Sequence, residues 1–262
     1  MAQVISRKSK MKSRNQYELK LMRKSGRIAS SALNKAIETI RVGVTEIEVD
    51  NAARDEIYRL GGDLSYKSVP GYKYATCITV NEQVVHGIPT ERKFEAGDLV
   101  SVDLAVEHRG WHTDCAWSII VDDGKLKVED GKEKEKFLRA GEEALWEAIA
   151  QAVDGNRIGD ISNAIQTKVE GAGYSVVRSL VGHGVGRSLH EKPEIPGFGR
   201  KDEGAILKKD MTIAIEVIYT MGSREVVLEQ DGWTFSTADK SMGGLFEMTV
   251  IVGKKAEVLT CL

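Results

Sequence analysis

The sequence predicts an α+β fold in which two pseudo-symmetric halves surround one central antiparallel sheet, and three observations lead to this prediction. Segments with helical periodicity alternate with short apolar runs that are typical of strands. The order of two helices and two glycine turns occurs twice along the chain. The chain has 262 residues, of which 42% are hydrophobic, and this length can bury a core without disulfides or structural metals.

The first repeat begins with a helix predicted over residues 17–41. Its apolar residues recur at helical spacing, and the pattern closes at Gly43. Thr45 then opens a second helical pattern, which ends at Gly61 and Gly62. Apolar runs that are typical of strands follow this second helix.

The second repeat has the same plan 112 residues later. A helix predicted over residues 133–153 closes at Gly155, and a further helical pattern leads to Gly171 and Gly173. The charged stretch 121–136 is the predicted boundary, because it is too short and polar to contain another element. The expected organisation is a basic arm over residues 1–12 and one domain over residues 13–262, with halves at about 13–125 and 126–262.

Charge is distributed unevenly along the chain. Residues 1–27 hold nine Lys or Arg and one acidic residue, a local charge of +8, which leaves −10 for the other 235 residues. A basic arm of this kind either contacts a polyanion such as ribosomal RNA or remains a solvated, poorly ordered terminus. Both interpretations stay open, since the arm carries no RNA-binding signature.

Composition also bounds the location of the protein. No uncharged apolar run approaches the roughly 18 residues of a membrane helix, so we expect no membrane span. The N-terminus has no apolar region after its charges, so we expect no secretory signal. The chain has three cysteines, at 77, 115 and 261, without the CxxC spacing of a zinc finger or a disulfide scaffold. So few unpaired cysteines are typical of a protein in a reducing cytoplasm.

Two carboxylates are predicted to face each other across a hairpin. The strands 98–106 and 111–121 flank a turn at 107–110, and pairing symmetric about the middle of that turn places Asp103 opposite Asp114. Like charges directly opposite each other destabilise a strand pair, so these side chains either reach water or share a cation. The apolar flanks favour burial and therefore the cation, because burial of two carboxylates without compensation is costly.

The second half supplies further candidate ligands. His183 lies between glycines at 182, 184 and 186, which would let the backbone fold tightly around an imidazole. Glu216 and Glu247 each interrupt an apolar, strand-like run. A lone glutamate in such a run usually points to solvent from an edge strand. Four acids and one histidine together, however, describe a site for two divalent ions.

These residues resemble the active site of type I methionine aminopeptidases. The order of that family's five metal ligands matches Asp103, Asp114, His183, Glu216 and Glu247, and its HGIP segment is found here at 86–89. The similarity extends from about residue 12 to the end. It implies the pita-bread fold and two divalent ions, of Co, Mn, Fe or Zn. It also implies removal of the initiator methionine from nascent proteins with a small second residue, by a hydroxide that the two ions activate.

The resemblance assigns a role to each matched ligand. Asp114 and Glu247 resemble the carboxylates that bridge the two ions. Asp103 would complete the site of one ion, and His183 and Glu216 would complete the site of the other. Glu216 also resembles the family's general base.

Other matched residues would contact the substrate. His190 resembles the histidine that contacts the scissile amide and steadies the developing oxyanion, and His86 the one that helps to handle protons near the new amine. Tyr72, Cys77 and Trp233 resemble the lining of the methionine pocket, with ordinary core packing as the alternative for Tyr72 and Trp233. The two remaining histidines are expected at the surface, at the tip of the hairpin: His108 and His112.

Four positions depart from the family's pattern. Lys73 and Val217 stand where the family has Pro, Leu189 where it often has Phe, and Met248 where it often has His. None of them removes a ligand, so the chemistry is expected to persist. The shape of the pocket and the backbone beside Glu216 are the features that these substitutions would change.

Two alternative functions remain at this point. An Xaa-Pro dipeptidase or aminopeptidase of the same fold would use the same five ligands, but such enzymes typically carry a sizeable domain before the catalytic one. The first repeated helix begins near residue 17, so we expect no such domain here. A non-catalytic pita-bread binding module would lose ligands that are all present here. The expected protein is a cytoplasmic monomer that acts on nascent N-termini, with ribosome contact through the basic arm as a further hypothesis.

Overall fold

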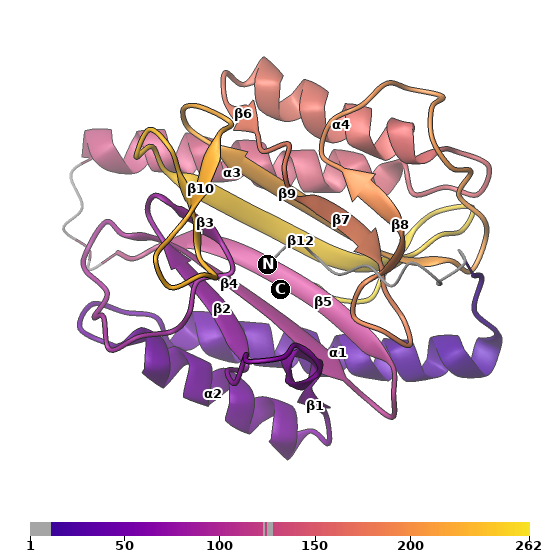
Figure 1. The fold of residues 1–262 in the computed structure, drawn as a ribbon, viewed down its shortest axis with the longest axis horizontal. Coiled ribbons are helices and arrows are strands. Elements are labelled where there is room, and N and C mark those ends of the chain that lie inside the picture. Colours follow the sequence, from indigo (N-terminus) through magenta and orange to yellow (C-terminus); the bar gives the residue numbers. More distant parts are fainter. Residues whose placement is uncertain (1–11, 123, 125–127) are drawn as a thin grey trace.

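Helices packed on a curved sheet make up most of the computed structural model, which describes residues 12–122, 124 and 128–262 (Figure 1). In chain order the elements are α1 (Gln16–Thr39), α2 (Glu46–Arg59), β1 (Asp63–Leu64), the 3₁₀-helix η1 (Ser65–Ser68), β2 (Thr76–Val80), β3 (Gln83–Val85), β4 (Leu99–Glu107), β5 (His112–Ile120), α3 (Val128–Ala150), α4 (Ile158–Gly171), β6 (Ser175–Val176), β7 (Val181–Gly184), β8 (Glu191–Pro196), β9 (Thr212–Thr220), β10 (Val226–Leu228), β11 (Phe235–Thr237), β12 (Gly243–Ile251) and β13 (Glu257–Val258).

The central sheet has ten strands, and its strand pairs are antiparallel. Its main path has the order β1-β4-β5-β12-β9-β7-β8, with β2 paired to β4, β6 to β9 and β13 to β12. The long strands β4, β5, β9 and β12 therefore lie side by side in its middle. The α+β class with a central antiparallel sheet is confirmed.

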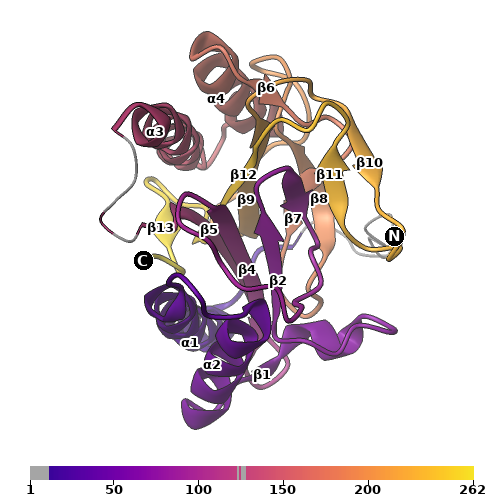
Figure 2. The ribbon, with the colours of Figure 1, turned by 90° about the vertical axis from the view of Figure 1, so that its left-hand side faces the viewer.

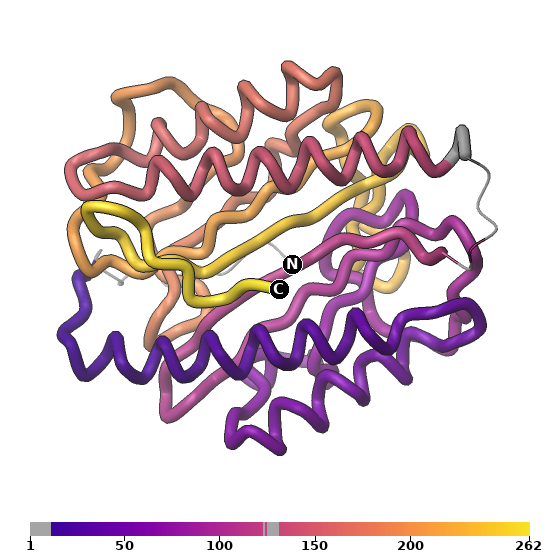
Figure 3. The backbone as a smooth tube through the Cα atoms, turned by 180° about the vertical axis from the view of Figure 1, so that it is seen from behind, coloured from indigo at the N-terminus to yellow at the C-terminus, as the bar shows by residue number. Residues whose placement is uncertain are grey.

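The helices cover one face of this sheet in two pairs (Figures 2 and 3). Helix α1 packs on α2 over one side of the sheet, and α3 packs on α4 over the other. Seen from behind, the C-terminal segment lies between the two pairs. The opposite face of the sheet is left for other parts of the chain, among them the small sheet β10-β11-β3.

Capping residues fix where the first two helices begin. The side chain of Asn15 accepts from the backbone N–H of Glu18, whose carboxylate accepts in return from the N–H of Asn15. Thr45 and Glu48 form the same reciprocal pair before α2. Such capping boxes satisfy N–H groups that have no partner within the helix, so these sequences favour helix starts at these positions.

Each helix pair buries an apolar core against the sheet. Ile28 of α1 packs in one cluster with Val102 of β4, and Phe137 of α3 packs in another with Val217 and Met248. All five side chains are at most 2% exposed. Two of the four departures from the family's pattern, at 217 and 248, therefore lie in the core beneath α3 and α4.

The glycines of the repeated pattern have matching conformations. Gly43 and Gly155, which follow the first helix of each pair, have φ values of 86° and 96°. Gly61 and Gly173, which follow the second, have φ values of 79° and 91°. These left-handed conformations favour glycine, and they end the helices close to where the sequence predicts.

The predicted start of the first helix of the second half is wrong. The sequence predicts this helix over residues 133–153, but α3 already begins at Val128, inside the charged stretch 121–136. Residues 128–136 contain several Glu and Lys, which are good helix formers, so charge alone did not mark a loop here. Most of the predicted basic arm, at residues 1–11, lies outside the described residues.

The predicted pairing of β4 with β5 is also wrong, by two residues. Asp103 is opposite Ala116, and Asp114 is opposite Ala105. The turn is a two-residue loop of Arg109 and Gly110, which both have positive φ (54° and 77°), as in a type I′ turn. Asp103 and Asp114 consequently lie diagonally on the same face of the sheet rather than directly opposite each other.

Among the described residues, none of the helices combines the length and the apolar character that crossing a bilayer requires.

Candidate metal centre and active-site pocket

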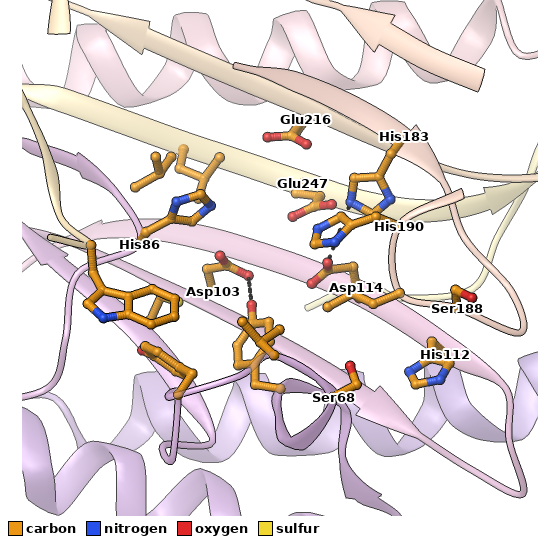
Figure 4. A pocket seen from close by; sticks show the side chains of 18 of the residues that line it. Ser68, His86, Asp103, His112, Asp114, His183, Ser188, His190, Glu216 and Glu247 are labelled. Carbon is orange, nitrogen blue, oxygen red and sulfur yellow. Dashed lines mark hydrogen bonds and ion pairs between the residues drawn. The ribbon is translucent and has the colours of Figure 1, made fainter. Parts of the chain in front are cut away.

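A pocket of about 390 Å³ lies on the face of the sheet away from the helices (Figure 4). Polar and charged side chains gather at its centre, and aromatic and aliphatic side chains form one end. All ten residues that the sequence predicts for the site line this one pocket: Tyr72, Cys77, His86, Asp103, Asp114, His183, His190, Glu216, Trp233 and Glu247.

Strand register brings the carboxylates together. Asp103 of β4 is opposite Ala116 of β5, Ala116 is opposite Glu247 of β12, and Glu247 is opposite Glu216 of β9. These four positions form a row across four strands, so their side chains share one face. Asp114 lies two residues along β5 from Ala116 and hence on the same face. The sheet therefore concentrates four carboxylates in one place, where they repel one another.

Burial makes this charge cluster costly. Burial raises the pKa of Asp114 well above its usual range, and repulsion by Asp103 and Glu216 raises it further. The pKa of Glu247 is also raised well above its usual value, first by burial and then by the neighbouring Asp114 and Glu216. Burial raises the pKa of Asp103 to about 6. Asp103 is therefore largely ionised at neutral pH, whereas Asp114 and Glu247 need a nearby cation to be ionised there.

The donor atoms fit divalent cations. Asp103, Asp114 and Glu247 bring their oxygens within 4.8 Å of one another, and so do the ligand atoms of His183, Glu216 and Glu247. The two sets share Glu247. Its Oε1 atom is buried without a hydrogen-bond partner among the described residues, so it is available as a ligand. Carboxylate oxygens with one imidazole suit borderline to hard divalent metals.

The imidazole of His183 is also oriented to bind a metal ion. Its Nδ1 lies 3.0 Å from the carbonyl oxygen of Gly184, which can only accept, so Nδ1 carries the proton. Nε2 is then free of a proton and lies 3.7 Å from Oδ2 of Asp114. Burial lowers the pKa of His183 to about 4, so the ring is neutral at physiological pH. A neutral ring with a fixed tautomer is the form that binds metals.

Close backbone contacts require the glycines at 182 and 184. A Cβ atom at Gly182 would lie 2.7 Å from the carbonyl oxygen of Ala214, and one at Gly184 would collide with the carbonyl of Lys192. Any side chain at these positions would push β7 away from β9 and β8. The glycines thus hold His183 close to Glu216, as the sequence suggested for an imidazole in a tight backbone.

Two further histidines complete the polar centre. His190 packs edge-on against His183, with ring centroids 4.4 Å apart, and burial lowers its pKa to about 3. Burial lowers the pKa of His86 to about 4. His86 has a φ of 60°, which is uncommon outside glycine, and a side chain at the following Gly87 would collide with the carbonyl of Ile78. This strained segment holds the imidazole of His86 at the pocket.

The apolar end adjoins the carboxylate row. The rings of Tyr72 and Trp233 lie 5.2 Å apart, and Cys77 of β2 is paired directly with Asp103 of β4. Leu189 packs in the same cluster as Tyr72 and Cys77 and lines the pocket. Of the four departures from the family's pattern, Leu189 is the one that lines the pocket, since Lys73 is exposed and the other two lie in the core.

The sequence prediction misplaced one histidine and missed one tyrosine. His112 was expected at the surface, but it is 7% exposed, lines the pocket and pairs with the hydroxyl of Ser65 through Nδ1 at 2.6 Å. Its position two residues before Asp114 on one strand was a usable signal, because alternate residues share a face. His108, at the end of β4, is only partly buried. Tyr66 also lines the pocket, and its hydroxyl donates to Oδ1 of Asp103 over 2.8 Å.

Comparisons with known proteins agree with this geometry. Residues 20–254 match the family described as metallopeptidase family M24. A methionine aminopeptidase from Clostridium perfringens is 42% identical over 248 residues, which cover 94% of this chain and 97% of that protein.

Solved structures extend the comparison. A methionine aminopeptidase from Thermotoga maritima superposes with a TM-score of 0.91 and 37% identity, over 97% of this chain and 100% of that one. A prolidase from Pyrococcus horikoshii has a TM-score of 0.73 and 23% identity, over 95% of this chain and 63% of that one. The likeness to the prolidase concerns the fold alone.

Proposed function

The chain belongs to metallopeptidase family M24, and we propose that it is a metal-dependent hydrolase that removes the N-terminal methionine from proteins. It has the pita-bread fold of the methionine aminopeptidase structure to which it is similar. The observation that carries the proposal is the position of the buried carboxylates and His183 directly beside an apolar end that contains Tyr72, Cys77 and Trp233.

The donor set supports a pair of divalent ions. Asp114 and Glu247 would be shared between the two ions, because each lies close to Asp103 in one set of ligand atoms and close to His183 in another. Asp103 would complete one site, and His183 with Glu216 would complete the other. Bound at these positions, Mn, Fe, Co or Zn would lower the pKa of a water molecule toward neutrality and polarise the peptide carbonyl.

The chain's own residues would hold the substrate and move protons. Glu216 would accept the proton of the attacking water as general base, since its carboxylate lines the pocket beside Glu247. His190 would donate a hydrogen bond to the carbonyl oxygen as negative charge develops on it. His86 would relay the proton that Glu216 has accepted to the leaving amine, since a neutral imidazole can accept at one nitrogen while it donates from the other. The low pKa values of His86 and His190 support neutral imidazoles, which can donate from one nitrogen and accept at the other.

The apolar end would bind the methionine side chain. A thioether is flexible and polarisable, and it makes favourable contacts with aromatic rings and with a thiol. Tyr72 and Trp233 supply the rings, Cys77 supplies the thiol, and Leu189 is less bulky than the Phe that the family often has. A small second residue in the substrate is proposed from the family resemblance.

The comparisons do not favour the alternative functions. The two methionine aminopeptidases match this chain over 97% and 100% of their own lengths, whereas the prolidase has more than a third of its length outside the match. The five candidate ligands are all present in the pocket, which weighs against a binding module that has lost catalysis.

We further propose that residues 13–262 act as one catalytic domain and that the protein is a cytoplasmic monomer. None of its cysteines, at 77, 115 and 261, forms a disulfide, which supports a reducing compartment. Its substrates would be the N-termini of nascent proteins, and the basic residues near the start of the chain would favour contact with ribosomal RNA.

A side-by-side peptide assay tests the proposal. The protein is treated with a chelator, restored with Mn, Co or Fe(II), and given Met-Ala-Ser and an Xaa-Pro peptide in separate reactions. We expect release of methionine from Met-Ala-Ser alone, and only with metal. Cleavage of the Xaa-Pro peptide alone would indicate a prolidase, and the absence of cleavage and of bound metal would indicate a binding module.

A further inference from the structure

The segment before α1 inserts a charged side chain into the interior of the protein. Ser13 forms an isolated antiparallel bridge with Met211, and the N–H of Arg14 donates to the carbonyl of Asp210 over 2.8 Å. The side chain of Arg14 is only 6% exposed and pairs with Glu191, whose side chain is 7% exposed, at 2.5 Å. This ion pair is therefore buried, and its acidic member directly follows His190 in the sequence.

Glu191 joins Arg14 to the loop that carries His190. Its Oε2 accepts from Nη2 of Arg14, and its Oε1 accepts from the backbone N–H groups of Arg187 (2.7 Å) and Ser188 (3.1 Å). The carboxylate therefore spans the loop from its middle to its end. Charge-assisted hydrogen bonds of this kind restrict the backbone more strongly than neutral ones do.

Arg14 also holds the other end of the same loop. Its Nη2 donates to the carbonyl of Val185 (3.2 Å), and its Nε donates to Oγ1 of Thr212 (3.2 Å). The hydroxyl of Thr212 in turn donates to the carbonyl of Val185 over 2.5 Å. One guanidinium therefore connects the start of the loop, its end and the neighbouring strand β9.

The guanidinium of Arg14 requires a glycine at position 186, the third glycine around His183. A Cβ atom at Gly186 would collide with the guanidinium of Arg14 and would lie 3.0 Å from Oε1 of Glu191. The sequence suggested that Gly186 helps the backbone to fold around His183. Its close contact is with the Arg14–Glu191 pair instead.

A buried ion pair is a weak source of stability, because removing both charges from water costs about as much as their attraction returns. Its value lies in geometry, and the planar fork of arginine fixes several acceptors at once. We propose that Arg14 is a positioning residue for His190: through Glu191 and Val185 it sets the conformation of loop 185–190 and thereby the place of the imidazole. This inference rests on the proposed function, in which His190 contacts the substrate carbonyl.

A double-mutant cycle between Arg14 and His190 tests it. We expect Arg14→Met to lower kcat on Met-Ala-Ser by about 10- to 100-fold, the effect of a displacement of about 1 Å in a catalytic group. In the His190→Ala background the same substitution should change kcat by less than about 2-fold, because the group that it displaces is gone. Metal affinity, measured by calorimetry, should stay within about 2-fold of the wild type.

Arg23→Met is the matched control. Arg23, in α1, forms a similar ion pair with Glu257 of β13, in which Nε lies 2.6 Å from Oε1. Its side chain is 35% exposed, and it does not line the pocket. We expect no change in kcat. If Arg14→Met does not fold, Arg14→Lys replaces it in the cycle, since lysine keeps the charge and loses the fork.

A second readout does not depend on turnover. The ring signals of His190 in a histidine NMR spectrum, assigned by their loss in His190→Ala, should shift or broaden in Arg14→Met, while those of His86 stay unchanged. Equal loss of kcat in both backgrounds, or unchanged His190 signals, would overturn the inference. A wild-type protein that releases no methionine with any metal would overturn the proposed function instead, and the NMR comparison would still decide the role of Arg14.

Discussion

The hydroxyl of Tyr66 donates a hydrogen bond to Oδ1 of Asp103 over 2.8 Å inside the pocket. Burial raises the pKa of Tyr66 well above its usual value, and repulsion by Asp103 and Asp114 raises it further, so the phenol keeps its proton. It therefore acts as a permanent donor to one oxygen of a candidate metal ligand. Such partners orient a ligand and tune how strongly it binds metal.

Removal of this donor should weaken metal binding. We expect Tyr66→Phe to reduce the affinity of the site that contains Asp103 by about 10-fold, the usual effect of losing a hydrogen bond to a ligand. Calorimetric titration of the metal-free protein measures it. Tyr174→Phe is the control, because Tyr174 packs on Phe137 away from the pocket. Unchanged affinity in Tyr66→Phe would mean that the hydrogen bond does not orient Asp103.

A bridging carboxylate should be indispensable. We expect Asp114→Asn to abolish stoichiometric metal binding and methionine release together, because an amide offers one neutral oxygen in place of a charged carboxylate. Metal analysis after dialysis and the Met-Ala-Ser assay check both. Turnover that survives in this variant would exclude Asp114 from the metal site.

The same substitution should stabilise the metal-free protein in a pH-dependent way. The pKa of Asp114 is raised in the folded state, chiefly by burial, so its folded state binds the proton more tightly than the unfolded state does. Stability from this group is present below its unfolded pKa and is lost as pH rises through the folded pKa. The amide that replaces the carboxyl group does not titrate. We therefore expect the Tm of Asp114→Asn to equal that of the wild type at pH 4 and to exceed it at pH 7.5 by at least about 3 °C, the effect of roughly 1 kcal/mol.

His190 should affect the chemical step rather than the metal. We expect His190→Ala to lower kcat by about 10²–10³, the usual cost of losing one donor to a developing oxyanion. Metal content should remain that of the wild type, because all five candidate ligands are intact. Steady-state kinetics with parallel metal analysis separates these effects, and a loss of metal would make His190 a ligand instead.

Trp233 should govern recognition of methionine. We expect Trp233→Ala to raise KM for Met-Ala-Ser by about 10-fold with a smaller change in kcat, since the loss of an aromatic wall removes roughly 1–2 kcal/mol of contact with the thioether. Metal binding should be unchanged. An unaltered KM would indicate that the methionine side chain binds elsewhere in the pocket.

Periodicity and spacing predicted most of the fold, and together with the family resemblance they named ten site residues, all of which line one pocket. Helix caps at Asn15 and Thr45 and glycines at helix ends are local signals, so the sequence shows them directly. Alternation along β9 and β12 likewise separates Glu216 and Glu247 from the apolar residues that face the core.

The errors have physical causes. The hairpin register depended on a turn in which Arg109 has positive φ, and arginine gives no hint of that conformation. The burial of His112 depends on Ser65 and on the loop at Gly186, which are distant in sequence. The Arg14–Glu191 pair joins residues 177 positions apart, so no local pattern could predict it.

The alternation along β12 has a consequence for how this protein can change. Glu247 points into the pocket, and the next residue, Met248, packs under α3 and α4. Substitutions at one position leave the other face intact, but an insertion or deletion of one residue before Glu247 would exchange the two faces. The carboxylate would enter the core and the thioether would enter the pocket. Insertions and deletions should therefore be tolerated in the loops that flank β12. Within the strand they should be excluded, even where the inserted residue is itself compatible with a strand.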